Sequence, residues 1–270
     1  MNAGADKVGT GRLRRRGFAA GVAGLAAAAW LCAAEAPPPT ELDPPAAGTK
    51  VLIVTGIDYP GHPWRETAPR LKELLEKDAR LKVGIVEDPE ALASPKLALW
   101  DTVILHFQDW EKPGPGPEAR ANLTRFVAGG KGLVLTHFAC GAWDGEWPEF
   151  KDLAGRVWDP KLRGHDPHGV FTVRIADPDH PITKGLASFE TLDELYTCLA
   201  GDAAIHVVAD AVSKVDGKVY PIAFVLPYGK GRVFHSVLGH DARAYNEAVG
   251  RLMRRGCAWA AGIDPEPAKP

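Results

Sequence analysis

Cysteine is scarce in this chain of 270 residues, which has four in all. Cys140, Cys198 and Cys257 are the three that follow the N-terminal segment, and such a small odd set is no disulfide framework, although one bridge is compatible with it. Beyond the N-terminal segment there is no basic stripe, and the net charge is −2, which argues against nucleic-acid binding. Internal repeats and metal motifs of the His-Glu-x-x-His type are also missing. Any functional site must therefore be inferred from how the predicted elements are arranged.

The longest apolar run lies near the N-terminus, over residues 18–34, and follows a segment rich in arginine. With about 17 residues it is at the short end for a membrane span, and the pattern is typical of a secretory signal peptide. Arg15-Arg16 before Gly17-Phe18 resembles a twin-arginine export signal, and a general secretory signal is the alternative. We expect residues 1–36 to be removed on export to the periplasm or the medium, which leaves no stable membrane insertion.

The first half of the remaining chain alternates between apolar strands and helices. A proline-rich linker, 37–49, precedes a domain predicted over 50–262 and a tail over 263–270. Such alternation predicts a mostly parallel, flavodoxin-like, doubly wound α/β sheet with helices on both faces. The expected strands cover 51–55, 82–86, 102–107 and 133–136, and the expected helices begin at Thr67 and cover 118–128.

The second half has strands with few helices between them. Turn formers at Asp216-Gly217 and Gly229-Lys230-Gly231 predict tight turns. We therefore expect the parallel sheet to gain an antiparallel extension, followed by a long final helix over 242–261. The strands expected in this half cover 170–175, 205–212, 220–226 and 232–238.

Polar side chains follow four of the predicted strands. His62 comes after the first strand, Asp109 after the third, His137 after the fourth and His240 after the last. Because ligands bind at the carboxyl ends of parallel strands, we expect these side chains to converge at one edge of the sheet. Three neutral imidazoles suit zinc or a similar divalent metal, so His62, His137 and His240 are candidate ligands. The alternative for His137 is a structural, hydrogen-bonded residue at a strand end.

Carboxylates and aromatic rings near these clusters are further candidates. Glu194, which follows a predicted loop beside Asp193, and Asp109 are candidate general acids or bases, and His137 is a candidate catalytic residue. A solvated acidic turn is the alternative for Glu194. Tryptophan faces beside polar groups suit stacking on a sugar, with ordinary core packing as the alternative. The candidate substrate-binding residues are Trp64, Trp110, Trp143, His168, Tyr196 and Asp241.

Cys140 lies close to the strand end at which glutaminases of related fold place their nucleophile. In this chain His137 occupies the strand end, and Cys140 comes three residues later. A thiol nucleophile also needs a paired base. We expect Cys140 to be a packed side chain.

Several segments together resemble the trehalose-utilisation ThuA-like family, over about residues 50–262. The resemblance implies the fold of class I glutamine amidotransferases without their cysteine nucleophile. It also implies a small-molecule carbohydrate as ligand and a role in the breakdown of oxidised (keto) disaccharides or glycosides. The implied enzyme is a hydrolase, lyase or isomerase rather than a glutaminase, and a non-catalytic carbohydrate-binding protein is the alternative. The resemblance to this family rests on segments 51–56 with His62, 129–137, 180–186, 193–196, 229–235 and 238–241.

Overall fold

The computed structural model describes residues 42–266. The predicted signal peptide, the first residues of the linker and the last four residues of the chain lie outside the described residues. Between residues 42 and 266, no helix is long and apolar enough to cross a membrane. Leu42, in the segment predicted to be a linker, is buried in a hydrophobic cluster, and Asp43 forms an ion pair with Lys96.

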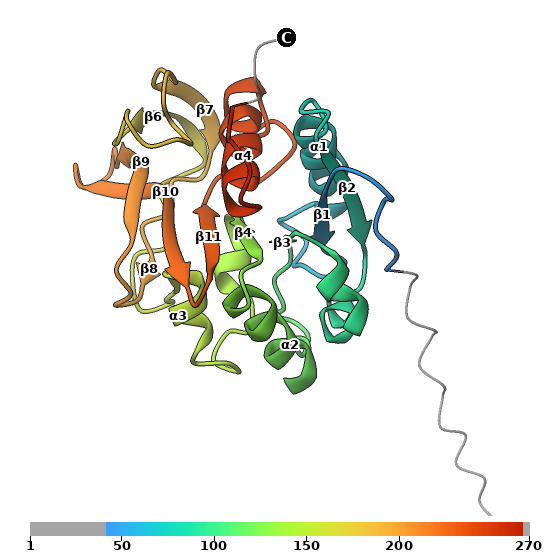
Figure 1. Cartoon of the computed structure of the whole chain (residues 1–270). Helices are drawn as coiled ribbons and strands as arrows, with labels where there is room; N and C mark the ends of the chain where they lie inside the picture. The colour runs from blue at the N-terminus through green and yellow to red at the C-terminus, as the bar shows by residue number, and fades with distance from the viewer. Residues whose placement is uncertain (1–41, 267–270) are drawn as a thin grey trace, which may run out of the picture. The chain divides into compact units, whose positions relative to one another are not determined.

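Nine strands of this part of the chain form one mixed sheet in the order β2-β1-β3-β4-β11-β10-β9-β6-β7 (Figure 1). The five strands from β2 to β11 in this order run parallel to one another. Their β-branched, apolar sequences suit a position between two layers of helices. These strands are β1 (Thr49–Val54), β2 (Leu81–Val86), β3 (Thr102–Leu105), β4 (Gly132–Thr136) and β11 (Gly231–Ser236).

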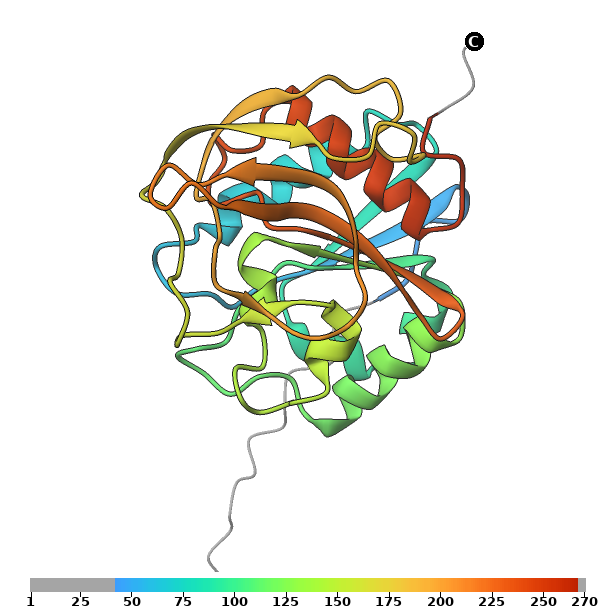
Figure 2. The same cartoon turned by 90° about the vertical axis from the view of Figure 1, so that its left-hand side faces the viewer.

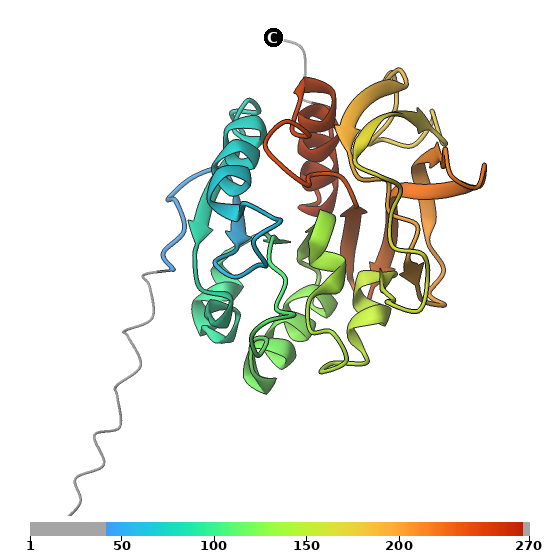
Figure 3. The same ribbon diagram turned by 180° about the vertical axis from the view of Figure 1, so that it is seen from behind.

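The remaining strands of the sheet pair antiparallel and continue it beyond β11. Figure 3 shows this extension beside α4, on the side away from α1. The predicted doubly wound sheet with an antiparallel extension is therefore confirmed. One strand of this sheet, β7, was missed by the sequence analysis, as were the two-residue strands β5 and β8. The extension contains β6 (Gly169–Ile175), β7 (Phe189–Asp193), β9 (His206–Val212) and β10 (Val219–Tyr228), while β5 (Val157–Trp158) and β8 (Leu199–Ala200) pair separately.

Two layers of helices enclose the parallel strands (Figure 2). Alternate side chains of a strand point to opposite faces, so Val51 and Ile53 of β1 join one hydrophobic cluster while Leu52 and Val54 join the other. The first cluster includes side chains of α1 (Trp64–Leu75) and α4 (Glu247–Ala260). The second includes side chains of α2 (Pro117–Ala128) and the short α3 (Phe150–Ala154).

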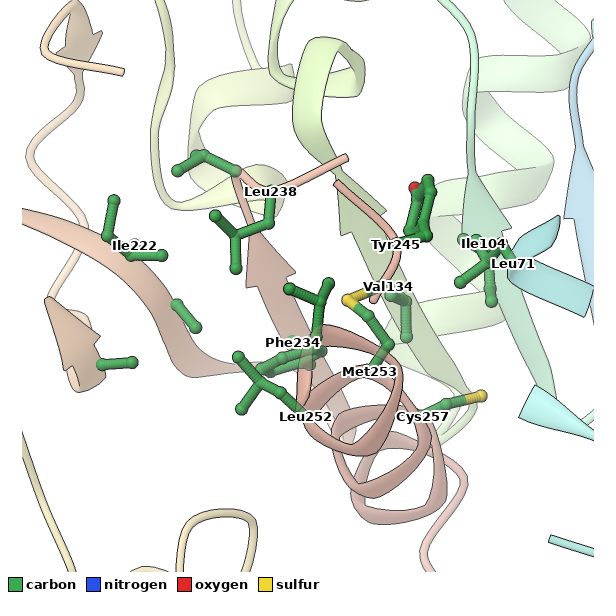
Figure 4. Close-up of a cluster of buried hydrophobic side chains, with 14 of the residues drawn as sticks. Leu71, Ile104, Val134, Ile222, Phe234, Leu238, Tyr245, Leu252, Met253 and Cys257 are labelled. Carbon is green, nitrogen blue, oxygen red and sulfur yellow. The ribbon is translucent and has the colours of Figure 1, made fainter. Parts of the chain in front are cut away.

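The close packing of α4 on the sheet depends on Gly256. A Cβ at this position would lie 2.1 Å from the Phe234 ring, so only glycine lets the helix approach β11 this closely. Figure 4 shows Leu252 and Met253 of α4 near Phe234 and Val134 of β11 and β4. This contact fixes the end of the chain against the strands that lead into the site.

Two helices begin at other residues than the sequence predicted. Helix α1 begins at Trp64 rather than at Thr67, whose hydroxyl donates to the Pro63 carbonyl from within the first turn. Helix α4 begins at Glu247 rather than near residue 242, because the Asn246 side chain caps it by accepting from the Val249 N–H. The apolar spacing continued past the start of α4 to Tyr245, whereas in α1 it began only at Leu71, so periodicity alone could not locate either start.

His235 on β11 is a fully buried titratable group that gives a prediction on acid stability. Its Nδ1 donates to the Ala154 carbonyl at 2.9 Å, and burial lowers its pKa from 6.5 to about 4. Between about pH 6.5 and 4, His235 is therefore protonated in the unfolded chain but stays neutral in the folded chain. We expect this residue to remove about 3 kcal/mol from the free energy of unfolding as the pH falls from 6.5 through 4.

Urea unfolding at pH 7, 6, 5 and 4 measures this effect. His235→Asn keeps an N–H donor for Ala154 but does not titrate, so its stability should fall less steeply with acid than that of the wild type. The exposed His206, changed to Asn, is the matched control and should leave the slope unchanged. Equal slopes for His235→Asn and the wild type would contradict the prediction.

Candidate metal centre

Three histidines and a glutamate meet at the carboxyl edge of the sheet. His62 follows β1, His137 follows β4 directly, His240 follows β11, and Glu194 follows β7. Each offers one nitrogen or oxygen atom, and these four atoms all lie within 4.8 Å of one another. The predicted convergence of His62, His137 and His240 is therefore present, and Glu194 joins it because β7 runs in the same direction as β11 at the far end of the sheet.

His137 is held in an uncommon backbone conformation. Its φ of +44° lies in the left-handed region, which residues other than glycine rarely adopt and which often marks functional sites. The side chain is fully buried, and Nδ1 donates to the Val237 carbonyl at 2.8 Å. This bond fixes the tautomer and leaves Nε2 as an acceptor, which receives the Tyr196 hydroxyl at 2.9 Å. The imidazole is thus fixed with Nε2 toward the cluster, and its single lone pair, which here accepts from Tyr196, would bind a metal only in place of that hydrogen bond.

His62 has a buried acidic partner of its own. Its Nδ1 donates to Asp58 Oδ1 at 3.0 Å, and both side chains are buried. Burial lowers the pKa of His62 and raises the pKa of Asp58. A neutral imidazole that donates one N–H to a carboxyl group presents its other nitrogen as a ligand, an arrangement common at metal sites. Asp58 was not among the residues singled out from the sequence.

Glu194 and His240 form the closest pair of the cluster. His240 Nδ1 lies 3.1 Å from Glu194 Oε2, and His137 Nε2 lies 3.7 Å from the same oxygen. Burial acts to raise the pKa of Glu194, but the two imidazoles outweigh it and hold that pKa below its usual range. Burial acts to lower the pKa of His240, and Glu194 outweighs it and raises the pKa. The glutamate is therefore a carboxylate, able to neutralise positive charge at this point.

Asp193 holds the backbone of two cluster residues, Glu194 and His240, in place. Its buried carboxylate accepts the backbone N–H groups of Gly239 at 2.8 Å, His240 at 3.1 Å and Glu194 at 2.9 Å. One side chain thus joins the segment after β7 to the segment after β11 and places two of the four cluster residues. The sequence analysis gave Asp193 no role of its own, because two of its three partners, Gly239 and His240, lie more than 40 residues away along the chain.

The donor set fits a divalent metal. Three imidazoles and one carboxylate, two of the imidazoles with outer hydrogen-bond partners, are the ligands that zinc and similar first-row metals prefer. His240 Nδ1 is buried yet makes no hydrogen bond of normal geometry, so it has a ligand position to offer. The side chains of this cluster are therefore able to hold a metal ion.

The sequence model of the ThuA family, described as trehalose utilisation, matches residues 50–260. The chain belongs to the ThuA family. The resemblance inferred from the motifs is thereby confirmed, and with it a place among proteins of carbohydrate utilisation. Among curated proteins no match is found.

Solved structures of ThuA-like proteins share the fold. One from Parabacteroides merdae is 24% identical, with a TM-score of 0.69 over 81% of this chain and 92% of that one. Another from Bacteroides uniformis is 18% identical, with a TM-score of 0.64 over 83% and 97%. A β-galactosidase from Bacillus circulans sp. alkalophilus is 15% identical, with a TM-score of 0.53 over 85% of this chain and 33% of that one. At these identities the likeness establishes the fold alone.

Asp109 is another of the candidate residues in this ThuA family member. Its side-chain hydrogen bond is to Trp143 and not to a residue of the cluster. Its carboxylate is buried and accepts the Trp143 N–H at 2.7 Å, and burial raises its pKa to about 6. An acid that titrates near neutrality suits proton transfer, so a role as general base stays a prediction.

The tryptophans predicted to stack on a sugar differ in exposure. Trp64 and Trp143 are buried, and the Trp143 ring packs against Phe107 and other aromatic rings. Trp110 is 42% exposed, and its Nε1 donates to the Gly141 carbonyl at 3.1 Å. Stacking stays a prediction, and it fits Trp110 best.

The remaining candidates lie around the cluster. His168 Nε2 is 3.8 Å from Asp241 Oδ2, and the rings of His168 and His240 are 5.3 Å apart. His165 Nε2 lies 3.7 Å from Glu194 Oε1, and the His165 side chain is 36% exposed. Partly exposed polar groups therefore border the buried ligands on the side of His165 and His168.

Cys140 is packed rather than reactive. The residue is buried in the hydrophobic cluster of α1 and α4, and burial raises the pKa of its thiol well above 9. Cys198 and Cys257 are also buried, and all three are free thiols. A thiol in such surroundings does not ionise at neutral pH, so it is no nucleophile.

Proposed function

We propose that this protein is a carbohydrate-processing enzyme that uses a divalent metal held by His62, His137, Glu194 and His240. The convergence of their four ligand atoms at the carboxyl edge of the sheet supports this proposal most directly. Its substrates are oxidised (keto) disaccharides or glycosides, in agreement with the family's description as trehalose utilisation. When bound, the metal supplies Lewis-acid polarisation of a sugar carbonyl or hydroxyl oxygen.

The side chains near the cluster supply proton transfer and orientation. Burial raises the pKa of Tyr196 well above 10, so its hydroxyl keeps its proton and donates a hydrogen bond at neutral pH. Asp109, with a pKa of about 6, is ionised at neutral pH and serves as the general base. His168 and Asp241, at the exposed border, bind sugar hydroxyl groups. A hydrolase, lyase or isomerase is compatible with this set of groups.

Metal analysis combined with activity assays tests the proposal. The protein as purified, or after dialysis against zinc, manganese or iron(II), should contain about one ion per chain. Turnover of a panel of keto-disaccharides and keto-glycosides should depend on that ion and return when it is restored after chelation. Turnover that is unaffected by complete removal of metal would refute the metal's role. Tight sugar binding without any turnover would instead favour a non-catalytic carbohydrate-binding protein.

We also propose that the enzyme works after export, which the N-terminal sequence pattern supports. If the twin-arginine route is used, changing Arg15 and Arg16 together to lysine should retain the protein in the cytoplasm. Cell fractionation and immunoblotting measure its location. Removal of residues 18–34 serves as the control, because it should block export by either route. Normal export of the double-lysine variant would favour the general secretory route.

A further inference from the structure

A continuous set of aromatic rings leads from the metal centre to the protein surface. On one side Tyr59 contacts His62, with ring centroids 4.6 Å apart, and Trp110 stacks on Tyr59 at 6.0 Å. On the other side Tyr196 contacts His137 at 4.4 Å. From there the rings continue through Trp158, at 5.2 Å from Tyr196 and 5.5 Å from Trp110. Both branches therefore end at Trp110.

Exposure increases along this set of rings. His137 and Tyr196 are buried, Tyr59 and Trp158 are partly exposed, and Trp110 is 42% exposed. The Trp110 ring is also fixed in orientation, by its hydrogen bond to Gly141 and by stacking on Tyr59 at an interplanar angle of 22°. An exposed ring that is held in place loses little side-chain freedom when a ligand covers it, which favours binding.

We infer that Trp110, supported by Tyr59 and Trp158, binds the second sugar ring of a disaccharide whose first ring lies at the metal centre. At least one aromatic ring separates Trp110 from every histidine of the cluster in the contacts given above. A monosaccharide at the cluster meets Tyr59 or Tyr196 first, whereas a disaccharide extends to Trp110. Apolar faces of a pyranose ring pack well on an indole. This inference rests on the proposed function and adds to the same site a position for the second sugar ring.

Isothermal titration calorimetry with trehalose, maltose, cellobiose and glucose tests the inference. At least one disaccharide should bind the wild type more tightly than glucose does. Trp110→Ala should weaken the binding of that disaccharide about tenfold and change the affinity for glucose less than twofold. Trp110→Phe, which keeps an aromatic face, should recover most of the loss. Trp259→Ala is the matched control, because Trp259 contacts Arg232 at the opposite edge of the sheet.

The outcomes separate this inference from the proposed chemistry. Circular dichroism and metal content should be the same for Trp110→Ala and the wild type, since the side chain is exposed. Disaccharide affinity within twofold of the wild type, or an equal loss for glucose and the disaccharide, would overturn the role of Trp110. A wild type that binds no disaccharide more tightly than glucose would do so as well. If the preference and its loss in Trp110→Ala are seen without any turnover, only the proposed reaction is wrong.

Discussion

His137→Asn is expected to lower metal affinity about 100-fold or more and kcat/KM on the best keto-sugar about 1,000-fold. His137 contributes a buried imidazole whose tautomer is fixed by Val237 and whose other nitrogen lies 3.7 Å from Glu194. Changing an outer partner of a metal ligand already costs tenfold to 100-fold in affinity, and loss of the ligand should cost more. A loss of several kcal/mol in Lewis-acid stabilisation corresponds to about 1,000-fold in rate.

Asparagine is the substitution of choice because of the backbone at residue 137. A φ of +44° is tolerated by asparagine better than by most other residues, so the variant should fold. Competition with a chromogenic chelator measures metal affinity, and steady-state kinetics measure turnover. The matched control is His206→Asn, which removes an exposed imidazole that is paired with Asp177. Metal affinity of His137→Asn within threefold of the wild type would exclude His137 as a ligand.

Asp193→Ala is expected to lower the free energy of unfolding by about 3–5 kcal/mol. Removing this buried carboxylate leaves the N–H groups of Gly239, His240 and Glu194 without their acceptor. Each buried donor that loses its partner costs about 1–3 kcal/mol. Asp193→Asn keeps the oxygen that receives Glu194 and His240 and loses the one that receives Gly239, so it should cost about 2 kcal/mol. Urea unfolding without added metal measures both values.

The same variants should disturb the metal centre. Asp193 fixes the backbone of two cluster residues, so metal affinity should fall in Asp193→Asn even though no ligand atom is removed. The matched control is Asp210→Ala, which breaks a partly exposed ion pair with Arg174 and should cost less than about 1 kcal/mol. If Asp193→Ala unfolds within 1 kcal/mol of the wild type, the carboxylate does not hold these segments together.

The parallel half of the fold could be predicted because its signals are local. Short apolar strands such as Val51–Val54 and Leu133–Leu135 alternate with helical spacing, and parallel strands must present their carboxyl ends at one edge. That rule alone brought His62, His137 and His240 together. The registers and the exact first residues of the helices depend on capping and packing, which periodicity does not encode.

Glu194 was predicted as an acid or base but not as a member of the histidine cluster. Its strand, β7, has only five residues and contains Glu190, Thr191 and Asp193, so it lacks the apolar run by which the other strands were found. Its place in the sheet comes from pairing with β6 and from the contact of Asp193 with the segment after β11. Such contacts between distant segments are determined by tertiary packing, which a single sequence does not display.

The cluster draws on almost the whole length of the folded domain, from His62 to His240. During synthesis the first of these residues is made long before the last, and the loop between them closes only when β11 joins β4. A partly folded chain therefore lacks the complete cluster, so the proposed metal would be bound with full affinity only by the finished domain. Stable metal retention would then distinguish a completely folded domain from a partly folded one.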